Sequence, residues 1–214
     1  MPDDFKAFPV PALRRLPSYL AFLRKLAKNG RDIVSCTHIA QDLRLDPTQV
    51  RKDIELTGIA GRPRIGYSVP ELIAAIEHFL GWDNMRDAFL AGAGSLGTAL
   101  AGYRAFREYG LNIVAAFDND PARIGTTVHG IEVLPSDRIP DLAERMHVHI
   151  GVIAVPAAAA QDVTDLMIFG GIKAIWNFAP ANIVVPDGIV VENVQLTGSL
   201  AVLTARLTEM ERVK

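Results

Sequence analysis

Ala88-Phe89-Leu90-Ala91-Gly92-Ala93-Gly94-Ser95-Leu96-Gly97 is the stretch of this 214-residue chain that decides its fold. An apolar run leads directly into the pattern Gly-x-Gly-x-x-Gly, which joins a strand to a helix in dinucleotide-binding domains. Gly92 permits the tight turn, Gly94 lets backbone N–H groups approach a pyrophosphate, and Gly97 lets the helix pack close to the sheet. The residues expected to bind a dinucleotide here are Gly92, Ala93, Gly94, Ser95, Leu96 and Gly97.

Asp118 ends the next predicted strand, residues 112–117, about twenty residues after the glycines, where this motif places an acid. Its carboxylate is expected to accept a hydrogen bond from a ribose 2′-hydroxyl and to repel a 2′-phosphate. Because neither Asn119 nor Asp120 is basic, we predict NAD(H) as the cofactor in preference to NADP(H). Arg123 is the residue that opposes this preference.

Apolar runs and helical segments alternate through the rest of this region. The predicted strands are residues 88–91, 113–117, 150–155 and 172–176, and the helical segments are 95–109, 136–146 and 157–169. Alternating strands and helices predict a parallel, doubly wound sheet. We therefore expect an α/β Rossmann domain over residues 82–196.

The front of the chain has a different pattern. Helices are predicted over residues 12–28, 37–44 and 46–58, with Asp46 as N-cap and Pro47 in the first turn of the third. A further helix over residues 70–80 ends at Gly81, a typical C-terminal cap. The two short helices joined near residue 45 predict a helix-turn-helix. Residues 1–81 are therefore expected to form a winged helix-turn-helix domain.

Charge and turn chemistry indicate that this domain binds nucleic acid. Residues 1–68 carry a net charge of +5 and residues 69–214 a net charge of −7. Val50 and Ile54 form the apolar face of the third helix, and the Gly- and Pro-rich stretch 61–67 predicts a basic hairpin, or wing. The residues expected to contact DNA are Gln49, Arg51, Lys52, Glu55, Arg62, Arg64 and Tyr67.

The last predicted helix has an apolar stripe without a partner in the sheet. Leu200, Leu203, Leu207 and Met210 recur at helical spacing between residues 198 and 212. We expect residues 197–214 to dock on a second subunit.

Signals for catalysis, metal binding and membrane insertion are weak. The five histidines, His38, His78, His129, His147 and His149, lack metal-ligand spacing or a paired acid, so no catalytic residue is assigned and an enzyme is not predicted. The single cysteine, Cys36, is interpreted as a small half-buried thiol. The longest apolar stretch, residues 150–160, is too short to span a bilayer, so a soluble, cytoplasmic protein is expected.

Segments spread over nearly the whole chain resemble the Rex family of redox-sensing repressors. They are Arg15-Leu16-Pro17, Gln49-Val50-Arg51-Lys52-Asp53 with Gly58, Gly66-Tyr67, the glycine loop, Val155-Pro156, Ala160-Gln161, Gly171-Ile172-Lys173, Trp176-Asn177-Phe178-Ala179-Pro180 and Asn193-Val194. The resemblance implies a homodimer with an exchanged C-terminal helix that represses genes by binding an inverted repeat in double-stranded operator DNA. It further implies that NADH releases the DNA.

The same resemblance implies roles for individual residues. Gln49, Arg51 and Lys52 match the recognition helix, and Arg62 or Arg64 matches the wing. The turn 178–180 matches a turn beside the nicotinamide. Added to the glycine loop and Asp118, the implied cofactor-binding residues are Tyr103, Val155, Pro156, Asn177, Phe178, Ala179 and Pro180.

The chain departs from the family pattern at two places. Ala21 and Gln195 stand where members usually have an arginine and an aspartate, which resemble an ion pair of the redox switch. Losing both leaves no orphan charge, but it removes one basis for strong discrimination between NADH and NAD⁺. Glu55-Leu56-Thr57 replaces a more usual Ser-Tyr-Phe or Ser-Tyr-Leu, and a carboxylate there favours a different operator, since it can accept from cytosine N4.

Three other interpretations of the glycine motif stay open at this point. One is an NAD-dependent oxidoreductase whose front domain mediates assembly, and turnover of a hydroxy acid or aldehyde would support it. Another is a coenzyme-A-responsive binding protein, which the co-purifying ligand would identify. The third is a strand-to-helix turn without any ligand.

Overall fold

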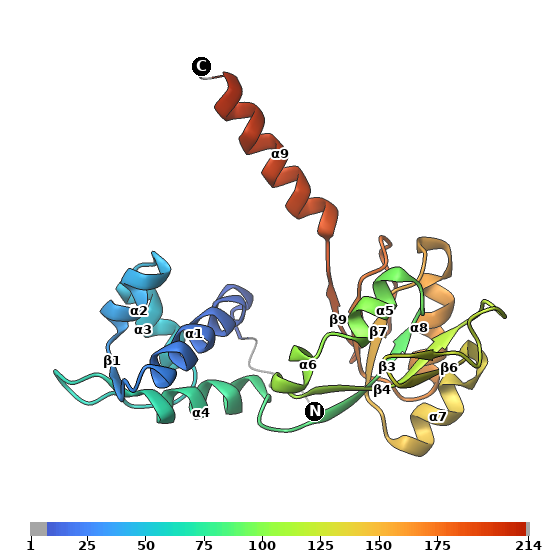
Figure 1. Cartoon of the computed structure of the whole chain (residues 1–214), viewed down its shortest axis with the longest axis horizontal. Coiled ribbons are helices and arrows are strands. Elements are labelled where there is room, and N and C mark those ends of the chain that lie inside the picture. Colours follow the sequence, from blue (N-terminus) through green and yellow to red (C-terminus); the bar gives the residue numbers. More distant parts are fainter. Residues whose placement is uncertain (1–7, 213–214) are drawn as a thin grey trace. The chain divides into compact units, whose positions relative to one another are not determined.

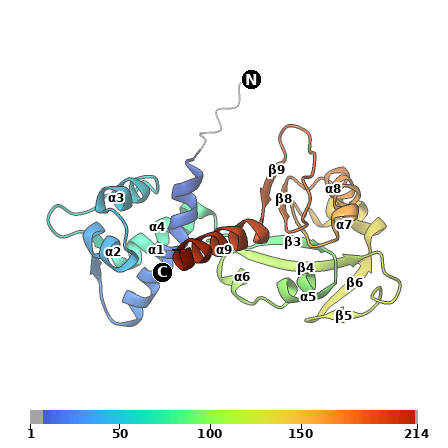
Figure 2. The same cartoon turned by 90° about the horizontal axis from the view of Figure 1, so that it is seen from above.

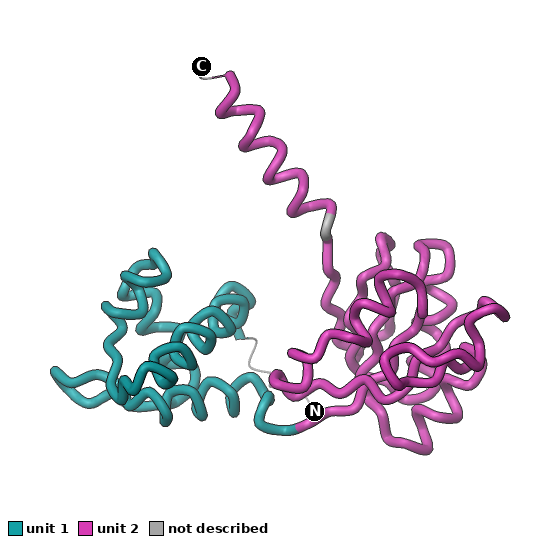
Figure 3. The backbone as a smooth tube through the Cα atoms, viewed as in Figure 1, with its two compact units in different colours: residues 1–84 teal, residues 85–214 magenta. Residues whose placement is uncertain are grey.

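The computed structural model describes residues 8–212, apart from the side chain of Leu196. The chain divides into two compact units, one ending at Asn84 and one beginning at Met85 (Figure 3). Each unit has its own apolar core. No helix in the described part of the chain is both long enough and apolar enough to cross a membrane.

The first unit is a helix-turn-helix with a small antiparallel ribbon (Figure 1). Its elements are α1 (Val10–Lys28), β1 (Ile33–Val34), α2 (Cys36–Leu43), α3 (Pro47–Glu55), β2 (Tyr67–Ser68) and α4 (Val69–Leu80). β1 pairs with β2, and Arg62 bridges to Gly66 to form the predicted hairpin. All four helices contribute to one core, so the unit positions α3 and the hairpin without help from the rest of the chain.

Local sequence explains where these helices begin and end. The Asp46 carboxylate accepts hydrogen bonds from the backbone N–H of Thr48 at 2.8 Å and of Gln49 at 3.0 Å, and Pro47 follows, as predicted. Gly81 caps α4 with a φ of 69°, also as predicted. The prediction that α3 runs to Gly58 was wrong, because α3 ends at Glu55 and a turn leads to Gly58 at a φ of 77°.

The second unit contains a seven-stranded sheet in the order β5-β6-β4-β3-β7-β8-β9. Most of these strands are labelled in Figure 2. The strands are β3 (Arg86–Ala91), β4 (Leu111–Asp118), β5 (Thr127–Val128), β6 (Ile131–Pro135), β7 (Ile150–Ile153), β8 (Ala174–Asn177) and β9 (Val190–Asn193). All neighbouring pairs are parallel except β5 and β6. This is the doubly wound Rossmann arrangement that the alternating pattern predicted.

Helices cover both faces of this sheet. They are α5 (Ser95–Ala101), α6 (Ala105–Glu108), α7 (Ile139–Met146) and α8 (Ala160–Phe169), with short 3-10 turns η1 (Ser136–Arg138) and η2 (Ala157–Ala159) before the last two. Phe89 and Ala91 of β3 pack with α7 and α8, while Ala88 and Leu90 pack with α5 and α6. Burial on both faces explains the uninterrupted apolar run before the glycines.

Two sequence predictions need correction in this unit. The expected helix over 95–109 is two helices, because the chain breaks at Gly102, whose Cβ would lie 2.5 Å from the His129 ring. The short strands β5, β6 and β9 were not predicted. The final helix, α9 (Leu196–Arg212), carries exposed Leu200, Leu203, Leu207 and Met210.

Candidate dinucleotide site and nucleic-acid interface

The three motif glycines serve different purposes in the structure. A Cβ on Gly92 would lie 2.4 Å from the backbone oxygen of Ala154, and a Cβ on Gly97 would lie 1.7 Å from the backbone oxygen of Gly92. Both glycines are therefore needed by the protein's own packing. A Cβ on Gly94 would meet only one atom within 4 Å, Nη1 of Arg123 at 3.6 Å. The space above Gly94 is an open cradle into which a side chain would project, which fits a bound pyrophosphate.

A pocket of about 360 Å³ lies over this loop, at the carboxyl ends of the strands. Its lining residues are Gly92, Gly94, Ser95, Leu96, Asp118, Asn119, Arg123, Ser136, Ala154, Val155, Pro156, Ala159 and Val163. The structure thus brings Gly92, Gly94, Ser95 and Leu96 of the glycine loop together with Asp118 and the Val155-Pro156 segment, which the sequence had assigned to one site. Two other predicted residues of the loop, Ala93 and Gly97, do not line this pocket. Sequence reasoning missed Ser136, which follows β6, because β6 itself was not predicted.

Asp118 accepts hydrogen bonds on both carboxylate oxygens. Oδ2 receives the backbone N–H of Ala93 at 2.8 Å and Nη1 of Arg123 at 3.0 Å, and Oδ1 receives the backbone N–H of Asp120 at 2.9 Å. Burial would raise the pKa of Asp118, but the hydrogen bonds outweigh it and hold the pKa below its ordinary value. Asp118 is therefore an ionised acceptor at neutral pH, suited to a ribose hydroxyl.

The turn after β8 borders a separate hollow of about 510 Å³. Phe178, Ala179 and Pro180 line it together with Asn193, Val194 and Gln195. The structure does not place this turn in the pocket over the glycine loop. Both nevertheless lie at the same edge of the sheet, because β3, β7 and β8 are parallel neighbours and the Phe178 backbone N–H donates to the Ile153 oxygen at 2.8 Å.

Asn177, a predicted cofactor contact, is bonded to the protein itself. Its buried side chain donates from Nδ2 to the Ala181 oxygen at 3.0 Å and to Asn193 Oδ1 at 2.8 Å, and its Oδ1 accepts the Ala179 N–H at 2.9 Å. These bonds use both amide hydrogens. Asn177 therefore positions the turn 178–180 and has no amide hydrogen left for a ligand.

Tyr103 also lies apart from the glycine loop. It borders a third hollow with Arg104, Arg107 and His129, and its side chain is 55% exposed. Its ring packs edge-on against Phe106 at 4.8 Å, and Trp176 links Phe106 to Phe178 at 5.3 and 4.8 Å between ring centroids. Tyr103 is thus connected to the turn after β8 through a row of rings.

In the first unit, α3 presents Arg51, Lys52 and Glu55 to solvent. Gln49 differs from them, because it is half-buried and its Nε2 donates to Asp53 Oδ1 at 2.9 Å. Part of the Gln49 amide, which was predicted to contact DNA, is therefore engaged within the protein. Asp53 also accepts two hydrogen bonds from Arg15 and one from Tyr19, so this cluster ties α3 to α1.

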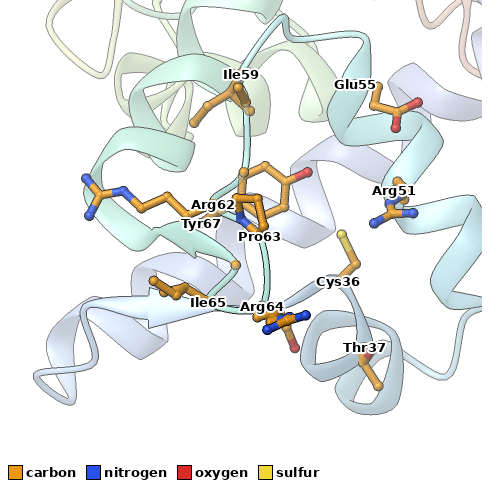
Figure 4. A pocket seen from close by; sticks show the side chains of 14 residues that line it. Cys36, Thr37, Arg51, Glu55, Ile59, Arg62, Pro63, Arg64, Ile65 and Tyr67 are labelled. Atoms are coloured by element: carbon orange, nitrogen blue, oxygen red, sulfur yellow. The ribbon is translucent and has the colours of Figure 1, made fainter.

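A hollow of about 590 Å³ separates α3 from the hairpin (Figure 4). Arg51 and Glu55 border it from α3, and Arg62, Arg64 and Tyr67 from the hairpin. A Cβ on Gly61 would lie 2.8 Å from the Tyr67 ring, so the ring packs closely on the start of the hairpin. Burial raises the pKa of both the Tyr67 hydroxyl and the Cys36 thiol. Tyr67 therefore supports the base of the hairpin, while the arginines stay exposed.

Among residues 8–212, no three histidine, cysteine or acidic side chains lie close enough to hold a metal ion. No histidine lines the pocket over the glycine loop.

Comparisons with known proteins agree with this two-part architecture. A family model described as "CoA binding domain" matches residues 83–181, and one described as "Putative DNA-binding protein N-terminus" matches residues 7–55. The redox-sensing transcriptional repressor Rex of Bacteroides fragilis is 47% identical over 204 residues, which cover 95% of this chain and 93% of that protein. Rex of Treponema denticola is 45% identical over 193 residues, which cover 90% of this chain and 92% of that protein.

Solved structures of RSP, a Rex-family repressor, match nearly the whole chain, and the structure without a named ligand covers 96% of it. The complex with beta-NAD⁺ and operator DNA superimposes with a TM-score of 0.91 at 34% identity and covers 97% of this chain and 95% of RSP. The complex with beta-NADH gives a TM-score of 0.86 at 33% identity and covers 96% of this chain and 97% of RSP. The chain therefore belongs to the Rex family of redox-sensing transcriptional repressors.

Proposed function

We propose that this protein is a DNA-binding transcriptional repressor that senses the NADH/NAD⁺ balance, with NADH on the Rossmann unit releasing the operator. The observation that carries the proposal is the open cradle at Gly94 on the same chain as an exposed basic recognition helix. One solved structure of the relative RSP contains operator DNA together with NAD⁺, and another contains NADH. The protein is not an enzyme, as its relatives are repressors. A repressor works on chromosomal DNA, which argues for the cytoplasm.

On the DNA side, exposed Arg51 and Lys52 of α3 are suited to the major groove. Arg51 can hold a phosphate or read guanine, and Glu55 can accept a hydrogen bond from cytosine N4. Arg62 and Arg64 on the hairpin reach the adjacent groove or backbone, with Tyr67 supporting them. Gln49 stays a proposed DNA contact, but only through the amide atoms that Asp53 leaves free.

On the cofactor side, the residues of the glycine loop fit the pyrophosphate, and Asp118 fits the ribose hydroxyls. The turn 178–180 is the proposed contact for the nicotinamide, because it lies at the same edge of the sheet as the glycine loop, and Val155 and Pro156 line the pocket over that loop. The bound dinucleotide supplies the redox signal. The protein contributes binding and orientation.

In the proposed division of the chain, residues 1–81 bind DNA, residues 82–196 bind the cofactor, and residues 197–214 form the dimer. The last range corresponds to α9. Its exposed apolar stripe supports exchange of this helix between two copies. A homodimer presents two recognition helices, which suits an inverted repeat with fixed half-site spacing. NADH then has to favour a dimer whose spacing does not match the operator.

Coenzyme A is the second candidate ligand, because the matched family model carries its name. The ionised Asp118 at the ribose end disfavours it, since coenzyme A carries a phosphate on its adenosine ribose. Mass spectrometry of the ligand released from purified protein separates the two candidates.

Operator binding measured against added NADH and NAD⁺ at one salt concentration tests the proposed function. The operator is first selected from random duplexes with the full-length protein. We expect NADH to release the duplex at concentrations where NAD⁺ does not, and Gly94→Val to be insensitive to NADH. Failure of the protein to select any duplex, or identical retention with both nucleotides, overturns the proposal.

A further inference from the structure

Arg123 is the only cationic side chain among the described residues that line the pocket over the glycine loop. It follows β4, and its Nη1 donates to Asp118 Oδ2 at 3.0 Å. Its Nε lies 3.5 Å from Asp120 Oδ2. The Arg123 side chain is 45% exposed, so packing does not fix it and the guanidinium is able to change partner.

The guanidinium stands over the place that the glycine motif keeps clear. Nη1 of Arg123 lies 3.6 Å from the point that a Cβ on Gly94 would occupy, and no other atom outside the adjacent residues lies within 4 Å of that point. Gly94 is the position at which the backbone of this motif approaches a pyrophosphate. A cation is therefore held beside the phosphate cradle.

The charges around this cradle are negative, and Arg123 can offset them. Asp118 lines the cradle, Asp120 pairs with Arg123 beside it, and a dinucleotide adds two phosphate charges. Repulsion among these anions weakens binding unless a cation is present. A guanidinium has five N–H donors in a planar fork that matches phosphate oxygens, and the contact with Asp118 leaves several of them available.

We propose that Arg123 is the diphosphate-binding side chain of this pocket. When the dinucleotide enters, the guanidinium exchanges the Asp118 carboxylate for the 5′-diphosphate, and Asp118 Oδ2 becomes available to the ribose hydroxyl. This inference rests on the proposed dinucleotide function and names the residue that recognises the charged part of the ligand. Only hydrogen bonds change partner in the exchange, and no covalent bond is made or broken.

Three ligands and two variants of the full-length protein test the exchange. NADH, ADP and adenosine are titrated into the wild type, Arg123→Met and Arg145→Met, with NADH fluorescence as the direct readout and competition for the other two. Arg145 is the matched control, because it is an exposed arginine of the same unit, paired with Asp141. Circular dichroism melting of each variant confirms that it is folded.

We expect Arg123→Met to lower the affinity for NADH and for ADP by about tenfold to a hundredfold, which is the range of a charge-assisted contact. The affinity for adenosine, which lacks phosphate, should not change. Arg145→Met should bind all three ligands with the affinity of the wild type. ADP has no 2′-phosphate, so its loss of affinity identifies the 5′-diphosphate as the group recognised. Unchanged or tighter NADH binding, or an equal loss for adenosine, overturns the proposal for Arg123. A wild type that does not bind NADH overturns the proposed function itself.

Discussion

Arg15 in α1 and Asp53 in α3 form a two-point ion pair, with Nε 2.7 Å from Oδ2 and Nη2 2.8 Å from Oδ1. Asp53 is 1% exposed, and the Tyr19 hydroxyl donates to the same carboxylate at 2.6 Å. The helix that carries Arg51 and Lys52 is therefore fixed to α1 by a buried charge with satisfied partners. Its orientation depends on this pair as well as on the apolar contacts of Val50 and Ile54.

Asp53→Asn should destabilise the first unit by about 3 kcal/mol, because removing one partner of a buried pair leaves Arg15 without its anion. Urea unfolding followed by circular dichroism measures the change. Asp42→Asn, the same substitution at an exposed position of α2, serves as the control and should change stability by less than about 0.5 kcal/mol. Equal stabilities for the two variants would show that the pair contributes nothing.

Acid should weaken the first unit through the same carboxylate. Burial would raise the pKa of Asp53, but hydrogen bonds from Arg15, Tyr19 and Gln49 outweigh it, so the folded-state pKa lies below the ordinary 3.8. The stabilisation is complete above pH 3.8 and is lost as the pH falls from there through the folded-state pKa. Urea midpoints measured between pH 6 and pH 2 should fall less steeply in Asp53→Asn than in the wild type.

Sequence patterns predicted the elements whose signals are local. Asp46-Pro47 marks a helix start, Gly81 marks a helix end, and the glycine motif follows a doubly buried strand, because each depends on a few adjacent residues. The short strands β5, β6 and β9 were missed because two to five residues carry too little periodicity. Their place depends on pairing with distant strands, such as β9 with β8.

The candidate sites show the same limit at the level of side chains. Helical position assigned Gln49 to the DNA-facing surface, and the family resemblance assigned Asn177 to the cofactor site, yet each is bonded to the protein itself. The partners, Asp53 for Gln49 and Asn193 for Asn177, become apparent only in three dimensions. The ion pair between Asp118 and Arg123 was equally hidden, although both residues had been singled out separately.

Gly94→Val and Gly97→Ala should separate ligand binding from folding. Gly94 has open space above it, so valine should abolish NADH binding and leave the melting temperature nearly unchanged. At Gly97 an added Cβ would lie 1.7 Å from the Gly92 oxygen, so alanine should destabilise the second unit by about 1–3 kcal/mol or more. NADH titration and thermal melting of both variants give the result. Normal NADH affinity in Gly94→Val would refute the assignment of the cradle.

Arg51→Ala should weaken binding to the selected operator by at least about 1 kcal/mol if Arg51 reads a base. The loss should then depend on the base pair opposite Arg51, whereas loss of a phosphate contact would be uniform across sequences and would reduce the salt dependence. Fluorescence anisotropy with the operator and single-base variants distinguishes the two. Lys28→Ala, at the end of α1, removes an equal charge from the same unit and should have a smaller effect.

Leu203→Glu should prevent dimerisation, because Leu203 is 65% exposed on α9 and belongs to an apolar stripe that only a second copy can cover under the proposed exchange. A charge in that stripe would have to be desolvated in the dimer. Ala205→Glu places the same charge on the opposite side of the helix, so it should remain dimeric. Light scattering after size exclusion measures the mass of each variant. Since one recognition helix cannot span two half-sites, the monomer should also lose most of its operator affinity, whereas a dimeric Leu203→Glu would rule out the stripe as the interface.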